Sequence, residues 1–250
     1  MSDSDQPTVV VIDDDESVRE SLRGLLETIS VDVAVFRSVE AFLSATPPVL
    51  PSCIVLDVRL PGASGFELQK QLVAANVDTP IVFITGHGDI PMSVRAMKAG
   101  AIEFLSKPFR EQELLDAVRQ GIERHRASVA QRRAWAQIRE RSAGLTDREK
   151  EIMTLLAQGR VSKQIAGQIG ISEVTVRVHR SQIMQKMGAR SLADLVRMVD
   201  RLEADGGNAL NPVAEDTYDG LPRSSRTAKR VTHAARKRKG RANFAKVTRR

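Results

Sequence analysis

Between residue 8 and about residue 125, short apolar runs rich in β-branched residues alternate with longer segments of helical periodicity. Runs such as TVVVI, CIVLD and PIVFIT have the length of single strands, whereas ESVRESLRGLLETI and GFELQKQLVAA carry apolar residues three and four apart. The pattern predicts an α/β fold, a doubly wound parallel sheet of five strands with helices on both faces. Ligands of such folds bind beyond the carboxyl ends of the strands.

A second pattern follows the first. A polar stretch of weak helical character predicts a linker helix over 123–140, and four short helical segments over 141–204 predict an all-α domain. Gly159, Gly170 and Gly188 separate these four segments. Residues 205–250 have too little apolar content to form a core, so we expect them to be disordered.

The charge of the chain is unevenly distributed, although the net value is +7. Residues 221–250 contain 12 of the 38 basic side chains and no acidic one, whereas residues 1–125 carry 11 basic and 19 acidic side chains. A single cysteine, Cys53, excludes a disulfide framework and a multi-cysteine metal site. No apolar run approaches the ~20 residues of a membrane span, so we expect a cytoplasmic protein without a membrane partner.

Reactive polar residues follow four of the five predicted strands. Asp13 and Asp14 follow the first, Asp57 the third, Thr85 the fourth and Lys107 the fifth. Each alone is more typical of a helix cap or a solvated turn, but parallel strands bring all of them to one edge. Carboxylates there suit Mg²⁺, and with a lysine and a hydroxyl they predict phosphoryl transfer onto an aspartate. Asp57 is the preferred nucleophile because it ends the central strand alone.

The motifs VVVIDDDES, LDVRLPGASG, ITGHGD and FLSKPF, in this order and spacing, resemble the receiver domain of bacterial two-component response regulators, in particular the FixJ branch. The resemblance covers residues 8–122 and implies a flavodoxin-like sheet. It implies that Asp57 accepts phosphate from a sensor histidine kinase. It also implies that Mg²⁺ binds to Asp13, Asp14, Asp57 and the backbone carbonyl of Arg59.

The same resemblance assigns roles to the end of the domain. Lys107 would hold the phosphate, and the bond to Pro108 would be cis, which is feasible chiefly before proline. Thr85 would move toward the phosphate and Phe104 would turn inward as the switch. Ordinary core packing is an equally good interpretation of Phe104. Asp15, by contrast, fits the start of the following helix, where a negative charge is favoured.

The segment 172–188 has two helical faces. Val176, His179, Ile183 and Met187 form a face that should pack, while Arg177, Arg180, Ser181 and Met184 form a free face. With the short helix before it, this segment predicts a helix-turn-helix whose second helix enters the DNA major groove. A small helical bundle with a solvated basic face fits the same pattern.

Within that hypothesis, Arg177 and Ser181 are expected to contact base edges, and Arg180 either a base or a phosphate. Residues expected at phosphates are Lys163, Thr175, Lys186 and the amides near Ser172. The sequence from LTDREKEI to SLADLV resembles the LuxR-type (NarL/FixJ) DNA-binding domain over about residues 141–203. That resemblance implies binding to double-stranded DNA as a dimer through Leu192, Leu195, Val196 and Val199.

Together these features predict a DNA-binding response regulator, not an enzyme, that forms a homodimer on phosphorylation and acts on transcription, with RNA polymerase as a further partner. One alternative is a haloacid-dehalogenase-like phosphatase, because Asp13-x-Asp15 also fits its nucleophile motif. The other is an architectural DNA binder led by the basic residues 221–250, which would add salt-sensitive, sequence-independent affinity. A merely solvated tail is the alternative for those residues.

Overall fold

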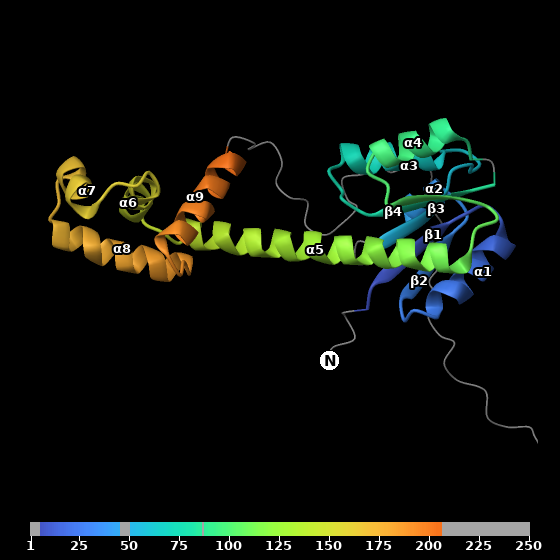
Figure 1. Ribbon diagram of the computed structural model, residues 1–250, viewed down its shortest axis with the longest axis horizontal. Coiled ribbons are helices and arrows are strands. Elements are labelled where there is room, and N and C mark those ends of the chain that lie inside the picture. Colours follow the sequence, from blue (N-terminus) through green and yellow to red (C-terminus); the bar gives the residue numbers. More distant parts are fainter. Residues whose placement is uncertain (1–5, 46–50, 87, 207–250) are drawn as a thin grey trace, which may run out of the picture.

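The computed structural model describes residues 6–45, 51–86 and 88–206, and Figure 1 shows their arrangement. The first part is a five-stranded sheet in the order β2-β1-β3-β4-β5, and every neighbouring pair is parallel. This confirms the predicted doubly wound fold. Its elements are β1 (Thr8–Ile12), α1 (Glu16–Glu27), β2 (Asp32–Phe36), α2 (Val39–Ser44), β3 (Cys53–Asp57), α3 (Gly65–Ala74), β4 (Ile81–Thr85), α4 (Ile90–Lys98), β5 (Glu103–Ser106) and α5 (Glu111–Ala143).

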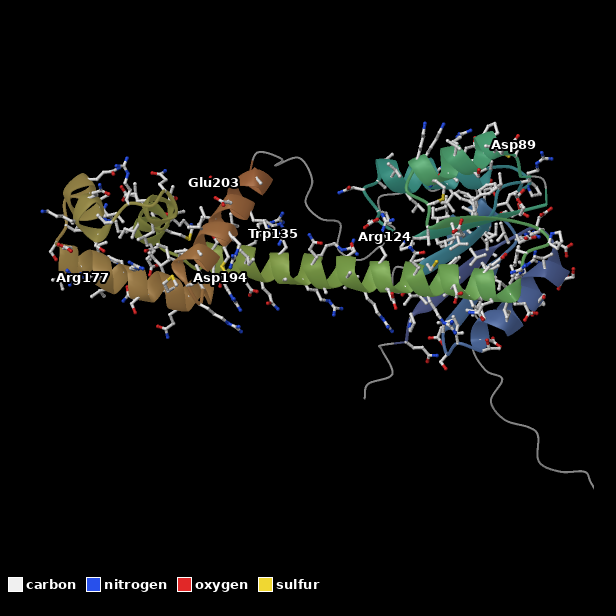
Figure 2. The ribbon with its side chains drawn as sticks, in the orientation of Figure 1. Asp89, Arg124, Trp135, Arg177, Asp194 and Glu203 are labelled. Atoms are coloured by element: carbon white, nitrogen blue, oxygen red, sulfur yellow. The ribbon has the colours of Figure 1, made fainter. Side chains whose placement is uncertain are left out.

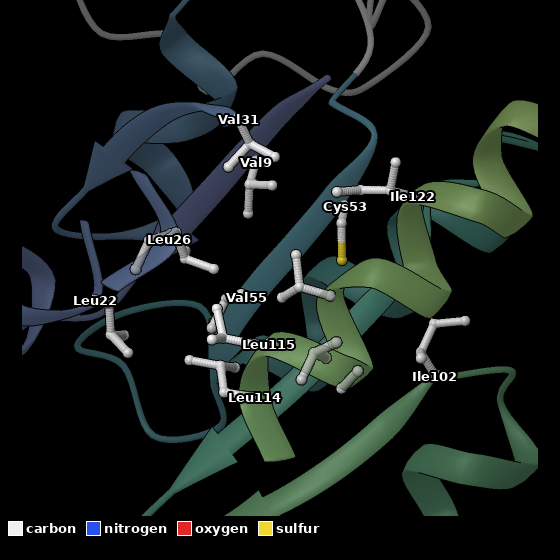
Figure 3. Packing of buried hydrophobic residues seen from close by; sticks show 14 of the residues in the cluster. Val9, Leu22, Leu26, Val31, Cys53, Val55, Ile102, Leu114, Leu115 and Ile122 are labelled. Carbon is white, nitrogen blue, oxygen red and sulfur yellow. The ribbon is translucent and has the colours of Figure 1, made fainter. Parts of the chain in front are cut away.

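Apolar side chains on the two faces of the sheet form separate cores. Val9 and Val11 of β1 face one cluster, which includes residues of α1 and α5, while Val10 and Ile12 face the other, which includes residues of α3. Figure 3 shows Val55 of β3 beside Leu115 in the first cluster. Every residue of β3 and β4 is buried, and strands covered on both faces have the continuous apolar runs seen in the sequence.

Helix α5 is longer than predicted. The segments expected as a last receiver helix and as a separate linker over 123–140 form one helix of 33 residues, about 50 Å long. Its first half packs on the sheet through residues such as Leu114 and Val118, and Ile138 near its end contacts the core of the second domain. The two globular parts therefore lie at opposite ends of α5 (Figure 1).

The second part consists of α6 (Asp147–Ala157), α7 (Ser162–Ile169), α8 (Glu173–Met187) and α9 (Leu192–Gly206). The predicted glycine breaks are confirmed, since Gly159, Gly170 and Gly188 follow three of these helices with positive φ. Helix α9 continues through residues 205 and 206, which were expected to be disordered; the remaining tail, 207–250, lies outside the described residues. In the described ranges no helix is both long and apolar enough to cross a membrane.

Candidate functional site

Three carboxylates and one lysine meet at the carboxyl edge of the sheet. One side-chain oxygen from each of Asp13, Asp14 and Asp57 lies within 4.8 Å of the others. Asp13 and Asp57 are buried, whereas Asp14 is exposed. The Lys107 ammonium donates to Asp13 Oδ2 at 2.6 Å and to Asp57 Oδ2 at 3.0 Å. The structure thus brings together the residues that the strand ends were predicted to gather.

The site is electrostatically unbalanced. Burial raises the pKa of Asp13, and the hydrogen bond from Lys107 only partly opposes this effect. For Lys107, burial disfavours the charge, but the hydrogen bonds to Asp13 and Asp57 outweigh it and raise its pKa. The lysine therefore stays charged at neutral pH. One ammonium among three carboxylates leaves negative charge that a cation would neutralise.

The backbone fixes how the carboxylates are oriented. Asp57 Oδ1 accepts from the Arg59 amide at 2.9 Å, and Asp13 Oδ1 accepts from the Asp15 amide at 2.9 Å. The first bond holds the backbone of residue 59 next to the Asp57 carboxylate. Three carboxylates with an adjacent peptide form a hard-oxygen donor set of the kind that suits Mg²⁺.

Asp15 has a different environment from its two neighbours. It is the N-cap of α1, and its Oδ1 accepts from the Ser17 amide at 2.8 Å and the Val18 amide at 3.4 Å. A bond from the Ser17 hydroxyl, at 2.7 Å, is the first cause of a lowered pKa of Asp15. The expected position at the helix start is confirmed, and it turns this carboxylate away from the cluster.

The switch candidates line the neighbouring strands. Thr85 ends β4 and is fully buried, and its carbonyl accepts from the Lys107 amide at 2.7 Å. The Lys107–Pro108 bond is cis, as the resemblance implied. Phe104 is half-buried, with its ring centroid 6.4 Å from that of Phe83. This contact is compatible with both interpretations of Phe104, so its switch role remains a prediction.

Gly88 is a residue that sequence reasoning did not single out. A Cβ atom there would lie 2.8 Å from the Phe104 ring, 2.8 Å from Ser106 Oγ and 3.0 Å from the Thr85 methyl group. Only glycine lets the β4–α4 loop lie this close to both switch candidates. The ITGHGD motif contained the signal, but its second glycine was not interpreted.

The predicted faces of α8 are largely found in the structure. Val176, Ile183 and Met187 are buried, and His179 is partly buried. Arg177, Arg180 and Ser181 are exposed, as is Lys163 on α7. Figure 2 labels Arg177, whose guanidinium is 2.9 Å from Glu173 on the same helix. Met184 was expected on the free face but packs against the core.

Two predicted phosphate contacts have partners within the domain. Ser172 caps α8 by accepting from the Thr175 amide at 3.0 Å. Lys186 donates to Glu149 Oε2 at 2.7 Å, and this bond is the main reason that the pKa of Glu149 falls to about 2. Because Glu149 is only 3% exposed, Lys186 holds α8 against α6. Its availability for DNA is therefore lower than the sequence indicated.

Exposed valines were also missed on α8. Val174 is 67% exposed and Val178 is 52% exposed. The two valines are four residues apart, and Ser181 follows Val178 by three residues, so the three lie on the same side of the helix. The sequence prediction did not include these two valines on the free face. On α9 the reverse error occurred, since Leu195 and Val199 are buried in the domain core and are unavailable for a dimer surface.

Comparisons with known proteins agree with this geometry. Residues 9–119 match the family described as "Response regulator receiver domain", and residues 143–199 match "Bacterial regulatory proteins, luxR family". Nodulation protein W of Bradyrhizobium diazoefficiens is 49% identical over 199 residues, which cover 80% of this chain and 88% of that protein. The chain belongs to the FixJ-like response regulators with a LuxR-type domain.

Other relatives share the same arrangement. The transcriptional regulatory protein FixJ of Azorhizobium caulinodans is 46% identical over 190 residues, covering 76% of this chain and 90% of that protein. A solved structure of the response regulator StyR is 52% identical, with a TM-score of 0.70, and covers 78% of this chain and 99% of that chain. This chain is therefore a two-component, DNA-binding response regulator. The family consists of transcription regulators and not of classical enzymes.

Proposed function

We propose that Asp57 accepts a phosphoryl group from the phosphohistidine of a sensor histidine kinase. The convergence of Asp13, Asp14, Asp57 and Lys107 at one sheet edge carries this proposal. A carboxylate oxygen of Asp57 attacks the phosphorus, the phosphorus–nitrogen bond breaks, and the histidine ring keeps the electron pair. One phosphoryl group is taken up per chain, so the chemistry is stoichiometric and not a turnover.

Mg²⁺ would be held by Asp13, Asp14, Asp57 and the Arg59 carbonyl. When bound, it supplies neutralising charge for the phosphoryl oxygens. Lys107 keeps its proton because its pKa is raised, so it offers a second positive charge to the same oxygens once they displace the Asp57 contact. Asp15 contributes only through its backbone amide, which fixes the Asp13 carboxylate.

The phosphate signal would reach the surface through Thr85 and Phe104. Both lie beside the site on the adjacent β4 and β5 strands, with Gly88 close to each. The Thr85 hydroxyl would bond a phosphate oxygen, and Phe104 would fill the space that the threonine leaves. Rearrangement of the β4–α4 loop would then follow.

The receiver would dimerise through α4 when phosphorylated. Ile90, Val94 and Met97 are 79%, 45% and 44% exposed, and their spacing places them on one helix face. An exposed apolar stripe of this kind is typical of a protein interface. A second copy of the chain is the partner we propose for it. Of the expected α9 surface, Val196 and Leu192 are half-exposed, and Leu192 also packs against the core of the DNA-binding domain.

DNA recognition would use the free face of α8. Arg177 and Ser181 are proposed at base edges, with Val174 and Val178 against thymine methyl groups and Arg180 at a base or a phosphate. Lys163, Thr175 and the amides after Ser172 would contact phosphates, and Lys186 is a weaker candidate because of its bond to Glu149. The site of action would be the cytoplasm, with RNA polymerase as a further partner.

The alternative functions receive less support. A phosphatase of the haloacid-dehalogenase type would use Asp13 and Asp15 together, but the Asp15 carboxylate is bonded to the start of α1. An architectural DNA binder predicts DNA affinity that is indifferent to Asp57. The cluster of Asp13, Asp14, Asp57 and Lys107 offers a reason for an Asp57-dependent response, and the architectural interpretation offers none.

The test compares the wild-type chain with Asp57→Ala, each with and without a beryllofluoride phosphate mimic and Mg²⁺. DNA footprinting and sedimentation velocity are the two measurements. We expect the mimic to increase dimerisation and DNA occupancy in the wild type and to change neither in Asp57→Ala. Equal behaviour of the two proteins would refute the switch.

A further inference from the structure

A cavity lies between the middle of α5 and the end of α9, far from both sites described above. Its volume is about 240 Å³, and its lining includes Trp135 and Arg132 of α5 and Arg201 of α9. Ser128 and Gln131 are the other lining residues in the described part of the chain. The Arg201 guanidinium lies 4.9 Å from the centre of the Trp135 ring. Figure 2 labels Trp135 on the stretch of α5 that α9 overlies.

The side chains that line this cavity carry positive charge that no lining carboxylate balances. None of the five lining side chains is acidic, although two of them are guanidiniums. Arg132 Nη2 is shielded from solvent and has no hydrogen-bond partner among the residues that the structure describes. A buried donor left without an acceptor costs about 1–3 kcal/mol, and more when it is charged. Residues 6–45, 51–86 and 88–206 therefore supply no acceptor for Arg132 Nη2, and a carboxylate or another anion would do so.

We propose that this cavity is the docking site for the chain's own segment 215–219, with the sequence EDTYD. This segment lies outside the described residues. Residues 207–220 contain three acidic side chains and no basic one, immediately before the strongly basic residues 221–250. Carboxylates of the segment would bond to Arg132 and Arg201, and Tyr218, flanked by acids, would lie against Trp135.

The length of the chain permits this docking. Arg201 is five residues before the end of α9, about 7.5 Å along the helix axis. Residues 207–214 then separate α9 from Glu215 and span at most roughly 25–30 Å when extended. A connection of this length gives an effective concentration on the order of millimolar. Even a contact with a dissociation constant of about 1 mM would therefore be half occupied.

Charge and connectivity both favour this occupant over a separate molecule. Within the chain from residue 207 onward, acidic residues occur only at 215, 216 and 219. Their docking at α5 and α9 would hold the start of the basic segment 221–250 beside the linker helix. The site thus gives the tail a fixed point of attachment, whatever the function of its basic residues.

Trp135 permits a direct test, because it is the only tryptophan of the chain. The experiment measures acrylamide quenching of its fluorescence in the full-length protein. We expect the variant Glu215→Gln/Asp216→Asn/Asp219→Asn to show a quenching constant about twofold higher than the wild type, as expected when a half-occupied site empties. A synthetic peptide of residues 207–220 should restore protection. Arg132→Gln should raise quenching, and the peptide should not restore its protection.

The matched control neutralises three exposed acids of the receiver, by Glu27→Gln, Asp32→Asn and Glu123→Gln, and should leave quenching unchanged. Equal quenching in the wild type and the tail variant would overturn the proposal. So would protection that increases with protein concentration, because the occupant would then be a second copy. Restoration by inorganic phosphate as complete as by the peptide would indicate a general anion site instead. The measurement uses neither Mg²⁺ nor DNA, so its outcome is independent of the proposed phosphorylation switch.

Discussion

At the scale of single residues, the aspartates 13–15 show how neighbours in sequence acquire different roles. Asp13 is buried against Lys107, Asp14 is exposed beside the same cluster, and Asp15 caps α1. The roles of Asp13 and Asp15 follow from where β1 ends, because the strand delivers the first carboxylate to the sheet edge. The third then falls at the N-cap of the helix.

Asp14→Ala and Asp15→Ala should therefore change different properties of the protein, the first Mg²⁺ affinity and the second thermal stability. The first removes one of three carboxylate ligands, and we expect Mg²⁺ affinity to fall by about tenfold or more, with little change in thermal stability. The second removes a cap and should lower the melting temperature while Mg²⁺ affinity is kept. Calorimetric titration with Mg²⁺ and thermal unfolding distinguish the two. Loss of Mg²⁺ binding in Asp15→Ala alone would reverse the assignment of the two side chains.

Glu149 links α6 to α8 through Lys186 and also closes the capping box of α6 with Thr146. We expect Glu149→Gln to destabilise the chain by about 1–2 kcal/mol at pH 7. The reason is that the buried carboxylate, which accepts hydrogen bonds from Lys186 of α8 and from Thr146 at the start of α6, loses its charge. The pKa of Glu149 is lowered from 4.5 to about 2, so its contribution is complete above pH 4.5. It should be lost as the pH falls from 4.5 towards 2.

Urea unfolding of wild type and Glu149→Gln at pH 7 and pH 3.5 measures this difference. The stability gap should be smaller at the lower pH. The control is Glu151→Gln on the same helix, an exposed carboxylate paired with the half-buried Arg148, and it should change stability by under about 0.5 kcal/mol. A gap that is constant with pH would mean that the ion pair does not contribute.

At the scale of elements, Gly121 explains how α5 approaches the sheet. A Cβ atom there would lie 2.8 Å from Cys53 Sγ and 3.3 Å from Pro80 Cβ. Gly121→Ala should destabilise the receiver, because overpacking costs about 1–3 kcal/mol and exceeds the gain in helix propensity. Gly24→Ala in α1, where nothing lies within 4 Å, should instead stabilise it by about 0.5–1 kcal/mol.

Chemical denaturation of Gly121→Ala and Gly24→Ala compares their free energies of unfolding. The variant Cys53→Ala allows a double-mutant cycle with Gly121→Ala. The double variant Gly121→Ala/Cys53→Ala should be less destabilised than the sum of its single variants, since the clashing sulfur is absent. Additive effects would show that the two residues do not limit the approach of α5.

The elements that sequence could predict are those whose environment leaves a local signature. Strands β3 and β4 are buried on both faces, so their apolar runs are continuous, and their ends locate the cluster around Asp57. Other features depend on contacts between distant residues. The bond between Lys186 and Glu149 joins helices that are separated in sequence. Leu195 and Val199 belong to an apolar stripe whose period is the same for a core or an interface.

At the scale of the whole molecule, the continuity of α5 is the feature that the sequence did not reveal. Its middle is polar because it lies between two cores, and that polarity led to the prediction of a separate linker helix over 123–140. Ser128 and Arg124 contact Asp78 of the receiver, while Trp135 contacts Arg201 of α9. The stretch 129–134 is therefore the junction between the part of α5 that contacts the receiver and the part that contacts the DNA-binding domain.

Insertions at this junction test whether α5 sets the orientation of the two domains in the proposed switch. A helix turns about 100° per residue. Four helix-forming residues added after Ala130 therefore rotate one domain about the helix axis to within about 40° of its original orientation, whereas two added residues leave it about 160° from that orientation. We expect the phosphate mimic to increase DNA binding with the four-residue insertion and not with the two-residue one. The same four residues inserted between residues 220 and 221 should have no effect. If both insertions preserve the response, α5 acts only as a tether, because a tether keeps the domains together without fixing their rotation.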